Sequence, residues 1–213
     1  MKIRSKNLNL FFNFLLVVFV VISVYVMATS SDGVLTGSKF KALKYFTVQS
    51  NIFIGISALI SLIYLFFKKD KYPTWVVILK LIATTCLTLT FLTVLGYLAP
   101  LMGIWLVFQG ANLYMHLIIP VTAILCFIFL EPKVELKFKW NFFSIIPSGT
   151  YGIFYIICVF AFNDFGNIDG WDWYAFGTYG VGIGLVMLFG LNLVAFGSSV
   201  AMYALYKKVR SKW

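Results

Sequence analysis

Long apolar runs separated by short polar stretches dominate this chain of 213 residues. A helix needs about 20 apolar residues to cross the hydrocarbon core of a bilayer. Six runs meet that requirement, and they cover residues 10–28, 45–67, 74–99, 112–130, 142–162 and 179–206. The sequence therefore predicts an all-α, polytopic membrane protein whose single domain, residues 1–213, contains six transmembrane helices.

The basic residues between these runs are distributed unequally over the two sides of a membrane. The first connection, on one side, holds Lys39, Lys41 and Lys44. The chain ends and the second and fourth connections, on the other side, hold Lys2, Arg4, Lys6, Lys68, Lys69, Lys71, Lys133, Lys137, Lys139, Lys207, Lys208, Arg210 and Lys212. Because cytoplasmic segments carry the excess of Lys and Arg, both termini are predicted to be cytoplasmic, in a plasma membrane or a bacterial inner membrane.

The composition excludes an ordinary soluble domain. Hydrophobic residues make up 62% of the chain and charged residues 11%, whereas a soluble domain is about one quarter charged. The net charge of +10 follows from the basic cytoplasmic segments. We therefore expect membrane lipid, and no nucleic acid, as the partner of this chain.

Few ionisable or reactive groups lie inside the runs. Lys80 is about six residues from the inner end of its run, so its stem is predicted to snorkel to the interface; a role in an ion pathway is the alternative. Cys86, Cys126 and Cys158 all lie in runs, so no disulfide is predicted. Since phosphate-loop, zinc-protease and CxxC motifs are absent from the sequence, no cofactor or metal is predicted.

Two polar clusters open the second and fourth runs. Helical spacing places Thr47, Ser50 and Asn51 on one face of the second helix. Asn112, His116 and Pro120 share a face of the fourth, where the proline is expected to kink the helix and leave the His116 carbonyl free. At about 1.5 Å per residue, Thr47 lies ~3 Å and His116 ~6 Å inside their helices. The two clusters are thus predicted to lie level, near the extracytoplasmic face.

A hydroxyl beside a neutral imidazole is the minimum for nucleophilic acyl transfer. In this reading Thr47 is the nucleophile and His116 is the general base. Support for the oxyanion or for the orientation of the imidazole is expected from Gln49, Ser50, Asn51, Asn112 and Asp172, with Asp164 as an alternative carboxylate. Spacing alone favours another reading, in which the polar groups join helices and His116 is a satisfied core histidine.

The segments Tyr45-Phe46-Thr47-Val48-Gln49-Ser50-Asn51 and Asn112-Leu113-Tyr114-Met115-His116-Leu117-Ile118-Ile119-Pro120 resemble the androgen-induced gene 1 family and its bacterial relatives. Animal members of that family are multi-span threonine hydrolases of fatty acid esters of hydroxy fatty acids. The resemblance implies that the catalytic threonine and histidine of the family correspond to Thr47 and His116. The last outer loop, residues 169–174, departs from the bacterial pattern, so the resemblance identifies a site and leaves the substrate open.

Two further alternatives concern the nucleophile and the oligomeric state. Cys158 is a rival nucleophile at a depth similar to that of His116, although its apolar neighbours favour an inert thiol. Gly180, Gly184, Gly190 and Gly197 in the sixth run are predicted to permit close helix packing within the chain, with a homodimer contact as the alternative. The function predicted is an intramembrane threonine-dependent lipid ester hydrolase or acyltransferase; the alternative is a non-catalytic transporter or a membrane protein that binds a lipid or small solute.

Overall fold

The computed structural model describes residues 3–29, 39–67 and 72–211, and every regular element in these ranges is helical. Two elements, η2 and η4, are π-helical turns, and η1, η3 and η5 are 3-10 helices. In chain order the elements are α1 (Ile3–Thr29), η1 (Lys39–Lys44), α2 (Phe46–Phe67), α3 (Thr74–Thr93), η2 (Val94–Leu98), α4 (Ala99–Met102), η3 (Ile104–Phe108), α5 (Gly110–Leu113), η4 (Tyr114–Ile118), α6 (Ile119–Phe129), α7 (Trp140–Phe143), α8 (Ile146–Ala161), η5 (Phe176–Tyr179) and α9 (Val181–Ser211).

Six helical stretches in the described residues are long and apolar enough to cross a membrane, which confirms the all-α class and agrees with the six predicted spans. They are Lys6–Thr29, Phe46–Phe67, Thr74–Leu98, Gly110–Phe129, Trp140–Ala161 and Val181–Ser211. The last helix continues past its predicted end at Tyr206, because Lys and Arg are good helix formers and are favourable near a helix C-terminus. The fold is consistent with a multi-pass integral membrane protein.

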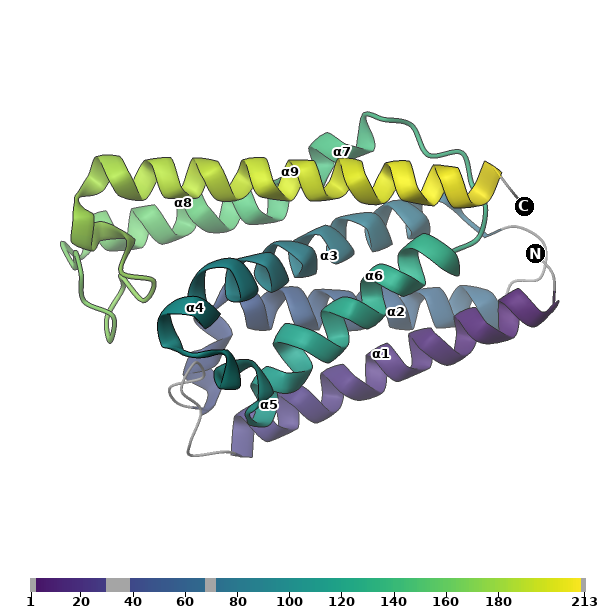
Figure 1. The fold of residues 1–213 in the computed structure, drawn as a ribbon, viewed down its shortest axis with the longest axis horizontal. Coiled ribbons are helices and arrows are strands. Elements are labelled where there is room, and N and C mark those ends of the chain that lie inside the picture. The colour runs from purple at the N-terminus through teal and green to yellow at the C-terminus, as the bar shows by residue number, and fades with distance from the viewer. Residues whose placement is uncertain (1–2, 30–38, 68–71, 212–213) are drawn as a thin grey trace.

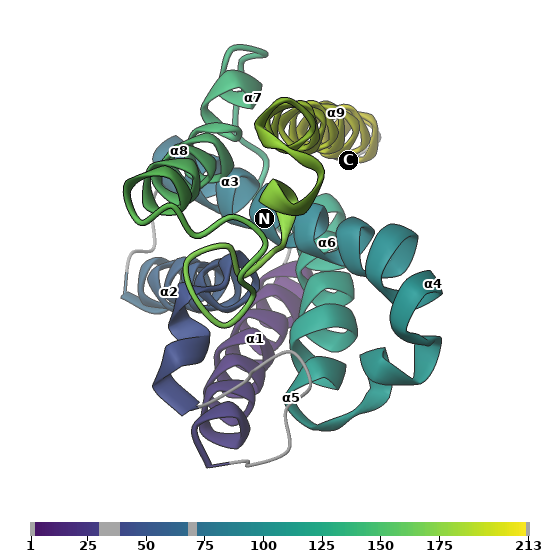
Figure 2. The ribbon, with the colours of Figure 1, turned by 90° about the vertical axis from the view of Figure 1, so that its left-hand side faces the viewer.

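The helices form two groups that lie side by side. The four helices α1, α2, α3 and α6 pack as one bundle, and α8 and α9 run together along its α3 side (Figures 1 and 2). Leu16, Ile54, Leu87 and Ile119, one from each of the four bundle helices, are fully buried in a common apolar cluster. A Cβ on Gly55 of α2 would lie 2.9 Å from Val20 Cγ1 of α1, so the two helices approach closely there.

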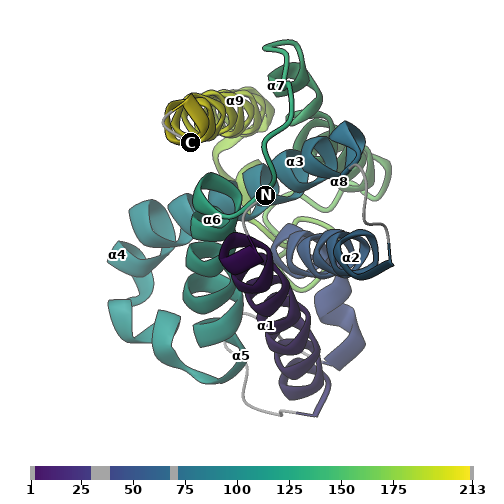
Figure 3. The same ribbon diagram turned by 90° about the vertical axis from the view of Figure 1, so that its right-hand side faces the viewer.

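The start of α1 and the end of α9 lie at the same end of the molecule, as an even number of spans requires (Figures 1 and 3). We call this the terminal end, and we call the other, which holds residues 162–180, the loop end. Several basic residues that underlie the predicted orientation lie outside the described residues: Lys2, Lys68, Lys69, Lys71 and Lys212. The cytoplasmic placement of the termini stays a prediction.

The glycines of α9 do not all serve close packing within the chain. A Cβ on Gly184 would lie 3.0 Å from the carbonyl oxygen of Phe176, so this glycine does permit a close approach. A Cβ on Gly190 or Gly197 would meet no atom within 4 Å. The prediction of tight intramolecular packing is therefore wrong at those two positions and at Gly180, where a Cβ would also meet no atom within 4 Å. Gly190 borders a cavity between α9 and α3, and Gly197 is exposed.

Candidate functional site

Two of the six long apolar helices contain a π-helical turn that ends two residues before a proline. In η4 the N–H of Ile119 donates to the carbonyl of Tyr114, five residues earlier, and Pro120 follows. In η2 the N–H of Ala99 donates to the carbonyl of Val94, and Pro100 follows. A proline lacks the N–H that would continue the helical ladder, and π turns are frequent at functional sites. Both turns lie near the loop end, and His116 belongs to η4.

The π turn moves the free carbonyl by one residue from the position that a straight helix predicts. At a spacing of five residues, the carbonyl paired with Pro120 is that of Met115, not that of His116. The side-chain amide of Asn51 on α2 donates to this carbonyl at 3.2 Å. The same amide nitrogen donates to the carbonyl of Thr47 at 2.8 Å. Asn51 thus joins the helix turn that carries Thr47 to the turn that carries His116.

The hydroxyl of Thr47 is half-buried and has no hydrogen-bond partner among the described residues. Threonines within helices usually bond a carbonyl one turn back, as Thr90 and Thr93 of α3 do at 2.8 Å. Thr47 lies in the first turn of α2, so no earlier turn of that helix offers it a carbonyl. The nearby carbonyls of Leu43 and Lys44 already accept hydrogen bonds from the side chains of Gln49 and Tyr151.

His116 is the only histidine of the chain and is 3% exposed. Its segment η4 packs against both α2 and α3. Its Nδ1 atom is buried and has no hydrogen-bond partner in the described part of the chain. Buried polar side chains are nearly always hydrogen-bonded. No protein group of the described residues therefore satisfies this ring nitrogen, and its partner has to be sought among the groups that surround it.

Thr47 lines a cavity of about 440 Å³ between the bundle and the α8–α9 pair, which we call the threonine cavity. Its wall is mainly apolar and includes Leu89, Leu188 and Val194, while its polar groups include Asn192. Small-molecule sites typically measure about 300–1,000 Å³ and have mostly apolar walls with a few polar groups. His116 is not among the lining residues. The cavity is therefore large enough for an apolar chain, and Thr47 offers it an unpaired hydroxyl.

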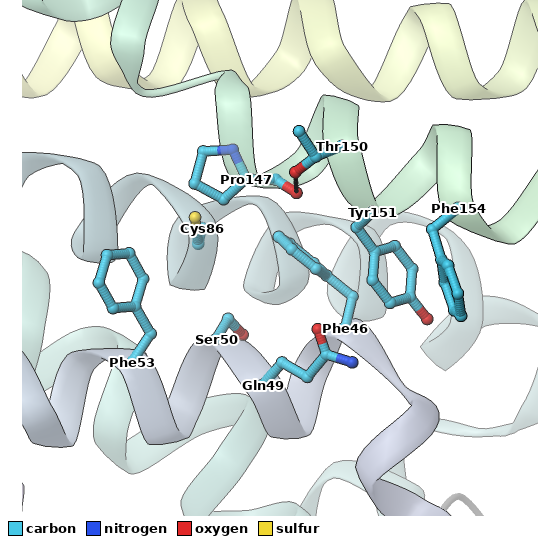
Figure 4. Close-up of a pocket in the computed structure, with 9 residues that line it drawn as sticks. All are labelled: Phe46, Gln49, Ser50, Phe53, Cys86, Pro147, Thr150, Tyr151 and Phe154. Carbon is cyan, nitrogen blue, oxygen red and sulfur yellow. Dashed lines mark hydrogen bonds between the residues drawn. The ribbon is translucent and has the colours of Figure 1, made fainter.

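A second cavity of about 400 Å³, the cysteine cavity, lies between α2 and α8 and includes Cys86 in its wall (Figure 4). Phe46 and Tyr151 line both cavities, and their ring centroids are 5.0 Å apart. These two side chains therefore contribute to the partition between the cavities. Gln49 and Ser50, which were predicted to support the site, line the cysteine cavity and not the threonine cavity.

Asp172 organises the loop at the loop end instead of serving as a hydrogen-bond partner of His116. Its carboxylate is fully buried and accepts hydrogen bonds from the Tyr155 hydroxyl and from the N–H groups of Gly166 and Gly177, the latter two at 2.7 and 2.9 Å. The alternative carboxylate, Asp164, accepts from the Asn167 side chain at 2.7 Å. Neither acid is hydrogen-bonded to the imidazole among the described residues; the hydrogen-bond partners of both lie within the loop or on Tyr155.

Two tyrosines attach this loop and α8 to the start of α2. The hydroxyl of Tyr174 accepts the N–H of Phe46 at 2.9 Å. The hydroxyl of Tyr151 donates to the carbonyl of Lys44 at 2.6 Å and accepts from the indole of Trp173 at 3.0 Å. Burial raises the pKa of Tyr174 to about 12. The loop is thereby fixed beside Thr47.

The remaining predicted site residues, Asn112 and Cys158, form no hydrogen bond with Thr47 or His116 among the described residues and line neither cavity. Asn112 is buried in α5, and its N–H donates to the carbonyl of Gln109 at 2.9 Å. Cys158, the rival nucleophile, is 6% exposed and lines neither of the two cavities. Its predicted state, a buried thiol, is confirmed.

Lys80 does not snorkel, since it is fully buried at the terminal end of the bundle. Its ammonium donates to the side-chain oxygen of Asn13, and the Asn13 amide in turn contacts the Cys126 sulfur at 3.8 Å. That sulfur lies 3.9 Å from a carboxylate oxygen of Glu131, which is also fully buried. Burial raises the pKa of the Glu131 carboxyl, and the nearby charges of Lys80 and Arg210 oppose this effect.

Sequence reasoning missed this polar network because its members were assigned to separate features. Glu131 directly follows the fourth run, 112–130, so the run pattern places it in a connection and not in a span. Asn9 and Asn13 are spaced i, i+4 at the start of the first run, which places them on one helix face. That spacing, together with a lysine inside a span, was the available signal.

Comparison with family models, with curated proteins and with solved structures finds no match to this chain. The candidate site therefore stands on its geometry alone.

Proposed function

We propose that this chain is an intramembrane lipid ester hydrolase or acyltransferase in which Thr47 is the nucleophile and His116 is the general base. The observation that carries the proposal is the unpaired hydroxyl of Thr47 in the wall of a mainly apolar cavity. A second observation supports it: the buried imidazole of His116 lies next to Met115, whose carbonyl Asn51 links to the turn of Thr47.

The proposed chemistry needs no cofactor. The Thr47 oxygen forms a bond to the ester carbonyl carbon while its proton passes to an imidazole nitrogen of His116. The carbon–oxygen bond to the leaving alcohol then breaks, and the alcohol takes the proton from the imidazolium. Water, or a second alcohol, attacks the acyl-threonine and restores the hydroxyl. The choice between these two acceptors separates a hydrolase from an acyltransferase.

Charge that develops on the carbonyl oxygen would be stabilised at the start of α2. The N-terminus of a helix favours negative charge because its first N–H groups lack helical partners. The N–H of Thr47 has no hydrogen-bond partner among the described residues. This N–H is the donor that we assign to the oxyanion, in place of the side chains of Gln49 and Asn112.

We further propose that the termini face the cytoplasm, as the distribution of basic residues predicts. Thr47 and His116 would then lie near the extracytoplasmic leaflet, and the substrate would be a lipid whose acyl chain occupies the threonine cavity. Aliphatic wall residues such as Leu89, Leu188 and Val194 suit such a chain.

Labelling of the purified protein with a lipid-like fluorophosphonate tests the proposal. The probe should modify the wild type and Thr47→Ser, whereas Thr47→Ala and His116→Ala should lose labelling with little change in thermal stability. Thr90→Ala is the matched control, because Thr90 also lines the cavity but its hydroxyl already bonds the carbonyl of Leu87. Undiminished labelling of Thr47→Ala would refute the role of Thr47.

The second candidate function, a non-catalytic transporter or binding protein, is favoured by the buried network of Lys80 and Glu131. Ionisable groups inside transmembrane bundles mark many substrate and ion pathways. Saturable solute uptake into vesicles that Lys80→Met abolishes, in a protein that the probe does not label, would support this function.

A further inference from the structure

The side-chain amide of Asn51 has a fixed orientation and an incomplete set of partners. Its two N–H bonds point at the carbonyl oxygens of Thr47 and Met115. A carbonyl cannot donate, so rotating the amide by 180° would place oxygen against oxygen. The Oδ1 atom is therefore fixed on the other side of the amide, where it is buried and has no hydrogen-bond partner.

The His116 imidazole also lacks a hydrogen-bond partner, at an atom that can donate. Its Nδ1 atom is buried without a partner. His116 directly follows Met115, whose carbonyl lies 3.2 Å from the Asn51 amide nitrogen. Two unpaired buried atoms, an oxygen that can only accept and a ring nitrogen that can donate, thus belong to Asn51 on α2 and to the residue of η4 that directly follows the acceptor of the Asn51 amide.

We propose that Asn51 is the positioning residue of His116: a bridging water molecule accepts a hydrogen bond from Nδ1–H and donates one to the Asn51 Oδ1 atom. The inference rests on the proposed function and specifies how the general base of that site is held. The hydrogen bond places the proton of the neutral imidazole on Nδ1 and leaves the lone pair on Nε2. Nε2 is then the nitrogen that takes the proton of Thr47.

The surroundings favour an amide over a carboxylate for this role. Two of the three acids of the loop end, Asp164 and Asp172, accept hydrogen bonds within the loop, and the third, Asp169, is exposed. Asn51 is fully buried, and a carboxylate at its position would carry a charge into an apolar setting at a high desolvation cost. A neutral acceptor fixes the tautomer without that cost. Pro120 contributes to the arrangement, because its missing N–H leaves the Met115 carbonyl free to hold the Asn51 amide.

The single histidine of the chain allows a direct test that does not depend on activity. Protein labelled with ¹⁵N only in histidine gives one pair of ring-nitrogen signals, and protonated and unprotonated ring nitrogens resonate far apart. We expect the wild type to show the Nδ1–H tautomer as the major form. The Asn51→Leu variant should revert to the Nε2–H form, which predominates in free neutral histidine.

Two further variants keep the test informative if Asn51→Leu does not fold. Asn51→Gln keeps the amide but displaces it by one methylene, so the Nδ1–H population should fall. Ser57→Ala is the matched control, since Ser57 is a fully buried residue of the same helix whose hydroxyl also lacks a partner; it should keep the wild-type tautomer. An Nε2–H wild type, or an Nδ1–H form that persists in both Asn51 variants, would overturn the inference.

Fluorophosphonate labelling then separates this inference from the proposed function. The labelling rate of Asn51→Gln should fall about 10- to 100-fold, by analogy with the loss when the hydrogen-bond partner of a metal-bound histidine is changed. A tautomer shift in a wild type that the probe never labels would uphold the positioning role and refute the hydrolase. Full labelling of Thr47 with no tautomer change would uphold the hydrolase and refute the positioning role.

Discussion

The buried ammonium of Lys80 donates a hydrogen bond to the side-chain oxygen of Asn13, which lies 67 residues earlier in the chain. This bond joins α3 to α1 at the terminal end. Asn9 extends it by donating to the carbonyl of Leu130 at 2.7 Å, and Glu131 follows that residue. A charge inside an apolar bundle persists only when such partners compensate for its lost hydration. The terminal end therefore depends on a complete polar network.

Removing the ammonium should destabilise the fold. We expect Lys80→Met to lower the free energy of unfolding by about 3 kcal/mol, because Asn13 loses its donor and buried Glu131 loses a compensating charge. Denaturant or thermal unfolding in detergent measures the change. Lys133→Met is the control. Lys133 is exposed in the connection between α6 and α7, so this change should alter stability by less than about 0.5 kcal/mol.

The double variant Lys80→Met with Glu131→Gln tests the electrostatic coupling. It should recover about 1 kcal/mol or more relative to the sum of the single effects, since each charge is unfavourable without the other. Additive single effects would contradict a coupled network.

The loop at the loop end should depend on the Asp172 carboxylate. Asp172→Ala removes the common acceptor of the Tyr155 hydroxyl and the Gly166 and Gly177 N–H groups. Unpaired buried donors cost about 1–3 kcal/mol each, so limited proteolysis within residues 162–180 should become much faster. The exposed Asp169 offers a control, Asp169→Ala, for which cleavage should stay at the wild-type rate.

Alkaline pH should weaken the attachment of the loop to α2 through Tyr174. The pKa of this phenol is raised by burial from 10.0 to about 12, so the unfolded chain releases the proton more readily than the folded protein. The Tyr174 contribution to stability is constant below about pH 10 and falls by about 1.4 kcal/mol per pH unit between pH 10 and 12. Melting curves of the wild type and Tyr174→Phe should therefore converge across this range. A difference that does not change with pH would contradict the prediction.

The six spans were predictable because membrane helices need long apolar runs, and these runs are visible without knowledge of packing. The face of α2 that carries Thr47 and Asn51 was also predictable, because residues at helical spacing share a face. The bond from Asn51 to Met115 was not predictable, because it requires the π turn that frees that particular carbonyl.

The burial of Lys80 could not be predicted from the sequence either. Its distance from the end of its run allows either snorkelling or burial, and the outcome depends on which residues of other helices meet it. Asn13 and Cys126 come from α1 and α6, and their convergence on Lys80 is a property of the folded bundle. Similarly, the occupation of Asp172 by backbone N–H groups follows from the loop conformation.

The π turn of η4 inserts an extra residue into one turn of its helix, so it rotates everything beyond it by about 100° relative to an uninterrupted α-helix. Deleting one residue in Tyr114–Ile118 would restore the ordinary pitch while keeping the length and hydropathy of the span nearly unchanged. Such a shortened protein should still insert into a membrane, but its imidazole would face a different neighbour. Insertion into the bilayer and alignment of the histidine thus place separate demands on the same short stretch of backbone.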